Sequence, residues 1–158
     1  AISARRILEN ILRFHSENLI KTYTPNSELL NHHICTDLMG FYKHVSFLYG
    51  NDKSFKAAWH ILKSSSQYEG WDTTSAWFLA ASSSAKIRDP ELALKIINKN
   101  QKELSLNQKM VKAAAYKAIG KTKKATLLFK KITVEAKSNK KHSYAMLFHL
   151  KKLFNVTD

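Results

Sequence analysis

The residue types that hold metal ions in proteins gather in one short segment of the chain. It contains His32, His33, Cys35 and Asp37. Imidazole, thiolate and carboxylate groups are the usual zinc ligands. Adjacent side chains point about 100° apart on a helix, and neither a second cysteine nor an H-x-x-x-H spacing completes a four-ligand site. The pattern therefore predicts no bound metal.

Two runs of serine, at 64–66 and 82–84, are the candidates for nucleophilic catalysis. A catalytic serine needs a neighbouring base and, in many hydrolases, a sharp G-x-S-x-G turn, and neither accompanies these runs. The chain also lacks a phosphate-binding P-loop and a dinucleotide fingerprint. Its 12 acidic residues are scattered singly, which leaves few carboxylates for acid–base work. We therefore expect no enzymatic activity, no catalytic residue and no cofactor.

The strongest chemical signal is an excess of lysine. The chain has 26 basic and 12 acidic residues, and its formal net charge is +14. Residues 101–158 contain 14 lysines and three acidic residues, whereas residues 1–100 contain 12 basic and 9 acidic residues. This asymmetry favours a polyanionic partner, because each phosphate that a lysine neutralises releases condensed counterions. A solvated lysine-rich surface is the alternative interpretation.

The lysines of residues 101–158 fall into two groups, according to the helix or linker that is expected to contain them. Six fall on a predicted first helix or in the linker before the next one: Lys109, Lys112, Lys117, Lys137, Lys140 and Lys141. We expect these six, together with Lys43, to contact phosphate, which lysine binds without reading sequence. The lysines of the intervening helix are expected to face solvent, and these are Lys121, Lys123, Lys124, Lys130 and Lys131.

Two adjacent aromatic residues, Trp77 and Phe78, could add stacking contacts. On a helix their side chains diverge by about 100°. We expect Trp77 to belong to the core and Phe78 to line an open groove, where its ring could stack on an unpaired base.

The composition indicates that helices position all of these residues. The chain of 158 residues is 44% hydrophobic and has only four glycines and two prolines, too few turn residues for a sheet protein. We expect a single all-α domain, long enough to bury a continuous core. The lone Cys35 excludes an internal disulfide. No apolar run approaches the ~20 residues of a membrane-spanning helix.

Four stretches are typical of amphipathic helix pairs; the clearest is 107–132, and 72–99 has the same arrangement. In 107–132, Gly120 separates the helices, as expected where a helix ends at positive φ. In 72–99, Asp89 and Pro90 are typical of a helix start. The residues predicted to be buried in the second helices are Leu92, Ala93, Ile96, Ile97, Ala125, Leu128, Phe129 and Ile132.

The same landmarks recur at a fixed period. A small residue within each second helix falls at Ala58, Ala93 and Ala125, at spacings of 35 and 32 residues. An aromatic residue near the start of the first helices falls at Tyr42, Trp77 and Tyr144. A period of this size predicts stacked helical hairpins, because one hairpin cannot bury its apolar face alone. Residues 1–39 do not fit this register and are interpreted as capping helices or a degenerate repeat.

The repeat resembles the pentatricopeptide repeat. The segment from Gly120 to Phe129, GKTKKATLLF, resembles the second-helix pattern of that family, and segments 88–97 and 54–62 resemble it more loosely. About three and a half repeats would occupy residues 40–158. The resemblance implies an α-solenoid of helical hairpins whose first helices line an RNA-binding groove. In organisation and composition the chain is similar to the divergent fungal mitochondrial members, which stabilise or activate translation of organellar transcripts.

The chain departs from this family at the positions that select bases. Typical members carry a small polar residue early in the first helix, whereas the register here gives Lys43, Phe78, Met110 and Ala145. None of the last three offers a discriminating hydrogen-bond pattern. The sequence therefore predicts RNA binding through backbone charge and stacking.

The resemblance implies a function in the stability, processing or translation of mitochondrial transcripts, in the mitochondrial matrix, with any targeting segment removed or outside this sequence. The expected partners are single-stranded RNA, messenger or ribosomal, and ribosomal or other RNA-processing proteins. The alternative is a scaffold for proteins, similar to tetratricopeptide repeats, or a ribosome-associated subunit. The tetratricopeptide signature of the first helix is missing, so RNA binding is preferred.

Overall fold

A computed structural model of the chain describes residues 71–81, 88–99 and 103–156, together with Lys56, Trp59, Leu62 and Lys63. The chain divides into two compact units, residues 1–71 with 82–87 and residues 72–81 with 88–158. Most of the described residues belong to the second unit. Lys43, Ala58 and the metal-ligand types at 32–37 lie outside the described residues, as does the expected N-terminal cap at 1–39.

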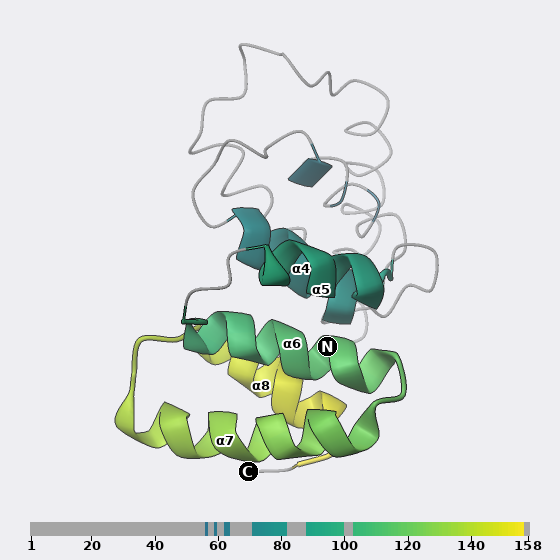
Figure 1. Cartoon of the computed structure of the whole chain (residues 1–158). Coiled ribbons are helices and arrows are strands. Elements are labelled where there is room, and N and C mark those ends of the chain that lie inside the picture. Colours follow the sequence, from purple (N-terminus) through teal and green to yellow (C-terminus); the bar gives the residue numbers. More distant parts are fainter. Residues whose placement is uncertain are drawn as a thin grey trace, which may run out of the picture. The chain divides into compact units, whose positions relative to one another are not determined.

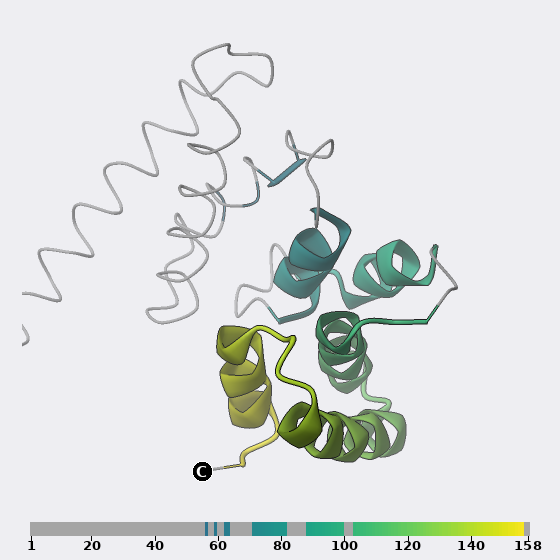
Figure 2. The same ribbon diagram turned by 90° about the vertical axis from the view of Figure 1, so that its left-hand side faces the viewer.

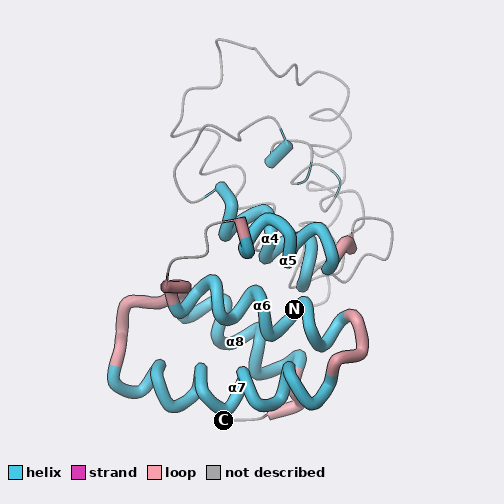
Figure 3. Tube along the Cα trace, in the orientation of Figure 1, coloured by secondary structure: helices cyan, strands magenta, loops and turns pink. Residues whose placement is uncertain are grey.

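Every described element is helical, and no strand occurs in the described ranges (Figures 1 and 3). The helices are α4 (Trp71–Ala81), α5 (Pro90–Asn98), α6 (Leu106–Ala118), α7 (Thr122–Ser138) and α8 (Tyr144–Leu153). The all-α prediction is confirmed for these residues.

The helix starts follow from short polar residues that satisfy free backbone N–H groups. The Asp89 carboxylate accepts a hydrogen bond from the Leu92 N–H at 3.0 Å, and Pro90 occupies the first position of α5, as predicted. Ser105 and Gln108 form a capping box at α6, in which each side chain accepts from the other residue's backbone N–H. Ser143 caps α8, which therefore begins at Tyr144.

The α6–α7 turn depends on Gly120, whose φ is +78°. The Gly120 N–H donates to the Lys117 carbonyl at 3.1 Å, and the Lys121 N–H donates to the Tyr116 carbonyl at 2.9 Å. These two bonds define a Schellman motif, which needs a left-handed residue at this position. The prediction that Gly120 ends the helix at positive φ is confirmed.

Helix α6 contacts α5, α7 and α8 (Figure 2). Its contact surface is built from small residues, since Ala113, Ala114 and Ala115 are all buried. Ala93 on α5 and Ala125 on α7 are fully buried, as predicted from the period. Small residues at these positions let helices approach closely.

Two contacts attach α8 to the α6–α7 hairpin. The Ser143 N–H donates to the Asn107 side-chain oxygen at 2.8 Å, which joins the starts of α8 and α6. The Phe129 and Phe154 rings are stacked, with centroids 4.4 Å apart, which joins α7 to the end of α8. Met146 and Leu150 complete the core on the inner face of α8.

The buried set of the second helices differs from the prediction at two positions. Ala93, Ile96, Ile97, Ala125, Phe129 and Ile132 are buried as expected. Leu92 is exposed and Leu128 is half-buried. Both lie at the edge of an apolar stripe, where a helix turns from its neighbour to solvent.

Candidate functional site

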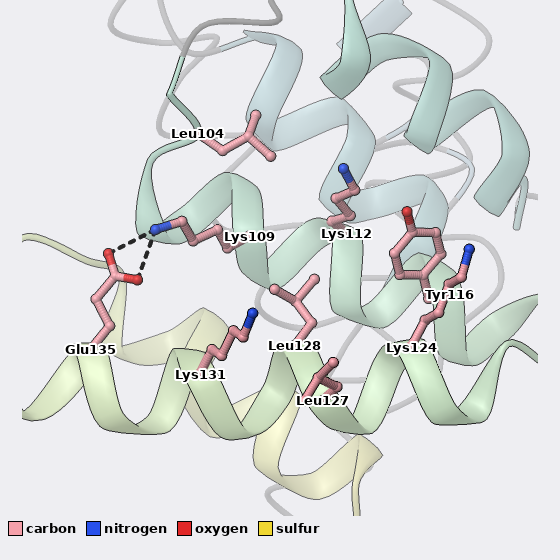
Figure 4. A pocket seen from close by; sticks show the side chains of 9 residues that line it. All are labelled: Leu104, Lys109, Lys112, Tyr116, Lys124, Leu127, Leu128, Lys131 and Glu135. Atoms are coloured by element: carbon pink, nitrogen blue, oxygen red, sulfur yellow. Dashed lines mark hydrogen bonds and ion pairs between the residues drawn. The ribbon is translucent and has the colours of Figure 1, made fainter.

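A cleft of about 410 Å³ runs between α6 and α7 (Figure 4). Helix α6 contributes Lys109, Lys112 and Tyr116, which recur every three or four residues along one helix face. Helix α7 contributes a matching row. The residues of that row are Lys124, Leu127, Leu128, Lys131 and Glu135. Leu104, which precedes α6 in the sequence, also lines the cleft. One face of α6 and one face of α7 therefore line this cleft.

The cleft combines an apolar surface with positive charge. Leu104, Leu127, Leu128 and the Tyr116 ring supply the apolar part, and four lysines face one glutamate. Lys124 and Lys131 extend from α7 toward the cleft (Figure 4). Fixed charges beside low-dielectric walls raise the local concentration of counter-ions. This arrangement suits an anion that also presents a flat or apolar group.

Lys109 is the lysine of the cleft that is already paired. Its ammonium donates to both carboxylate oxygens of Glu135, at 2.8 and 3.0 Å. Both side chains are partly exposed, so the pair stabilises the fold by only ~0–1 kcal/mol. A phosphate would have to compete with Glu135 for this ammonium. Among the predicted phosphate contacts, Lys109 is therefore less available than the sequence suggested.

Lys112 and Lys117 lie on different sides of α6. The Lys112 ammonium is 5.9 Å from the Tyr116 ring centroid, within the cleft. The Lys117 ammonium lies 4.6 Å from the Phe154 ring centroid, and Lys117 does not line the cleft. Of these two predicted lysines of α6, Lys112 therefore lies in the cleft and Lys117 lies beside Phe154 at the end of α8.

The remaining predicted lysines, Lys137, Lys140 and Lys141, are exposed in the last turn of α7 and in the linker that follows. The Lys141 backbone N–H donates to the Asn139 side-chain oxygen at 3.0 Å, which orders this linker while the ammonium stays in solvent. These three lysines are accessible to a polyanion, although they do not line the cleft.

The prediction that Phe78 lines an open groove is wrong. Phe78 and Trp77 are both fully buried, and every residue of α4 from Ser75 to Ala81 is buried. A ring without exposed surface cannot stack on a base. Met110, another residue at a base-selecting position of the register, is also fully buried, whereas Ala145 is exposed.

Two lysines that the sequence assigned to solvent belong to the cleft instead. Lys124 and Lys131 are exposed but line it from α7. Their spacing in the sequence already indicated a common face, because residues 124, 128, 131 and 135 lie on the same side of a helix. That face continues the cleft-lining row of α6 only because Gly120 folds the two helices antiparallel.

The cleft is suited to binding. Its polar groups are four ammonium ions, one phenol and one carboxylate that is already paired. In the described part of the chain, no group of three histidine, cysteine or acidic side chains could hold a metal ion.

The chain was compared with protein-family models, with curated proteins and with solved structures, and none of these comparisons gives a match. Within the described ranges, none of the helices is both long and apolar enough to span a membrane.

Proposed function

We propose that this chain is a helical-repeat protein that binds single-stranded RNA. The proposal rests on one observation above all, the charge that surrounds the α6–α7 cleft. Residues 103–156 contain 13 lysines and only two acidic residues, Glu103 and Glu135. Since Glu135 is paired with Lys109, Lys112, Lys124 and Lys131 are left to attract an anion in the cleft.

Lysine is suited to the phosphate backbone rather than to base edges. Its ammonium is a compact charge on a flexible stem, whereas bidentate base recognition usually requires arginine. Each lysine–phosphate contact with a single strand contributes about −0.7 to the slope of log K against log salt. A protein that depends on the three cleft lysines would therefore bind RNA with strong salt dependence.

The order of the helices supports a repeat arrangement of the pentatricopeptide type. Helices α4 and α6 begin 35 residues apart, at Trp71 and Leu106, and α5 and α7 begin 32 residues apart, at Pro90 and Thr122. In a solenoid, a first helix contacts the second helix of its own hairpin and that of the preceding one. Helix α6 does so with α7 and α5, whereas the corresponding contacts of α4 with α5 and of α8 with α7 are weaker.

Sequence selectivity is expected to be weak. Phe78 and Met110, which the register puts at base-selecting positions, are buried, and Ala145 offers no hydrogen bond. We expect unrelated single-stranded RNAs to bind within about tenfold of one another. An organellar role in transcript stability, processing or translation is the biological setting that the resemblance implies.

A protein scaffold is the second candidate, and the apolar part of the cleft favours it. Leu127 is 59% exposed and Leu128 lies beside it, so an acidic peptide with apolar side chains would find complementary groups there.

Ultraviolet crosslinking in cells tests the proposal and separates the two candidates. We expect covalently attached RNA to be recovered with the chain, enriched in organellar transcripts, and to decrease when Lys112, Lys124 and Lys131 are replaced by alanine. Recovery of protein partners with no RNA above the background of an uncrosslinked sample would contradict RNA binding and favour the scaffold.

A further inference from the structure

Helix α8 carries large apolar residues on two opposite faces. Met146 and Leu150 are buried against the rest of the unit. Tyr144 and Phe148 lie about 120–160° away from them around the helix, and their side chains are 66% and 46% exposed. Tyr144 and Phe148 are four residues apart, so they are neighbours along one face. The described residues cover the inner face of α8 and leave Tyr144 and Phe148 exposed on the outer one.

The outer face is surrounded by positive charge. The Lys152 ammonium lies 4.5 Å from the centroid of the Phe148 ring. Lys140 and Lys141 are exposed just before the helix, and α8 contains no acidic residue. The His142 ring lies beside Tyr144, with centroids 4.8 Å apart. Two accessible aromatic rings are thus flanked by cations at both ends of the helix.

We propose that this face is a stacking platform for unpaired nucleotides, with bases on Tyr144 and Phe148 and the adjoining phosphates on Lys140, Lys141 and Lys152. The inference rests on the proposed RNA-binding function and specifies the form of RNA that is bound. Every base has a flat face that an aromatic ring can accept. Bases in a duplex are already stacked on one another, so the platform selects single strands.

Charge argues against a second copy of the chain and against an apolar helix as occupants of this face. A second copy of the chain would bring an identical set of lysines against Lys140, Lys141 and Lys152, and like charges in a contact are strongly unfavourable. An apolar helix would strip water from the Lys152 ammonium without replacing its partners. A single strand of RNA covers the rings and neutralises the lysines together.

Binding of a labelled short oligouridylate to the whole chain tests the platform. We expect Tyr144→Ala/Phe148→Ala to lower the affinity by about tenfold or more, since each stacked base is worth ~5-fold to ~100-fold. The slope of log K against log salt should stay unchanged, because no charge is removed. Phe148→Trp should retain binding, whereas Phe148→Leu, which is apolar but not aromatic, should lose affinity like Phe148→Ala.

Several outcomes would overturn the platform. If the wild-type chain binds RNA with a steep salt slope and the double alanine variant binds equally well, the platform is wrong and the proposed function stands. If the wild-type chain binds no RNA, both fall. If the double variant abolishes a concentration-dependent dimer and leaves RNA binding intact, the face is a contact between copies. Ultraviolet crosslinks of oligouridylate that map away from residues 144–148 would also contradict the proposal.

Discussion

Helices α4 and α8 hold equivalent positions in the sequence register, yet they present their aromatic residues in opposite ways. Trp77 and Tyr144 are both landmarks near the start of a first helix. Trp77 and its neighbour Phe78 are fully buried, whereas Tyr144 and Phe148 are 66% and 46% exposed. Position in the packed unit, and not register, decides whether an aromatic ring stabilises the core or remains available to a ligand.

The largest expected effect of a substitution separates these two helices directly. Phe78→Ala should lower the free energy of unfolding by ~3–5 kcal/mol, because it removes a large ring from a closed core. Phe148→Ala, at a ring that is 46% exposed, should lower it by about 1 kcal/mol or less. Urea unfolding of both variants measures the difference. Equal losses of stability would mean that the two rings have the same environment.

The second prediction concerns the cleft. Replacing Lys112, Lys124 and Lys131 by alanine should lower the affinity for single-stranded RNA about 100-fold at 0.1 M salt, since three contacts at about 0.7 each give two orders of magnitude. The matched control replaces Lys121, Lys123 and Lys130, which are exposed at or on α7 but do not line the cleft. Equal losses in both triple variants would indicate diffuse attraction with no role for the cleft.

A larger side chain inside the α6–α7 hairpin should lower the stability of the unit, whereas one on the exposed face of α8 should not. Ala125→Leu inserts a larger side chain at a fully buried position of α7, which should cost ~1–3 kcal/mol of stability. Ala145→Leu, at an exposed position of α8, is the control and should be nearly neutral. Thermal unfolding compares them. A neutral Ala125→Leu would show that the two helices do not approach closely there.

Removing the partner of Lys109 should have a smaller effect on RNA binding. Glu135→Gln removes the carboxylate that holds this ammonium and should free one more phosphate contact. At 0.1 M salt one additional contact is worth about fivefold in affinity. Fluorescence anisotropy with labelled RNA can measure this gain. Unchanged affinity would place Lys109 outside the RNA-binding surface.

Local chemistry made much of the fold predictable. Asp89, Pro90 and Gly120 mark helix ends because their backbone preferences act within a few residues, and the period located the buried Ala93 and Ala125. The site was less predictable, since it depends on contacts between distant residues. Lys109 meets Glu135 across 26 positions of the chain, and Lys124 and Lys131 line the cleft only through the α6–α7 pairing. Phe78 was misassigned because helix periodicity does not reveal how many sides of a helix are covered.

The salt dependence of RNA binding by the unmodified chain shows whether the lysines of the cleft bind phosphate. The measurement is the affinity for a single-stranded RNA across a range of salt concentrations. If Lys112, Lys124 and Lys131 each contact a phosphate, the slope of log K against log salt should be about −2 or steeper. A slope near zero, or no binding at low salt, would contradict an RNA-binding function for this chain.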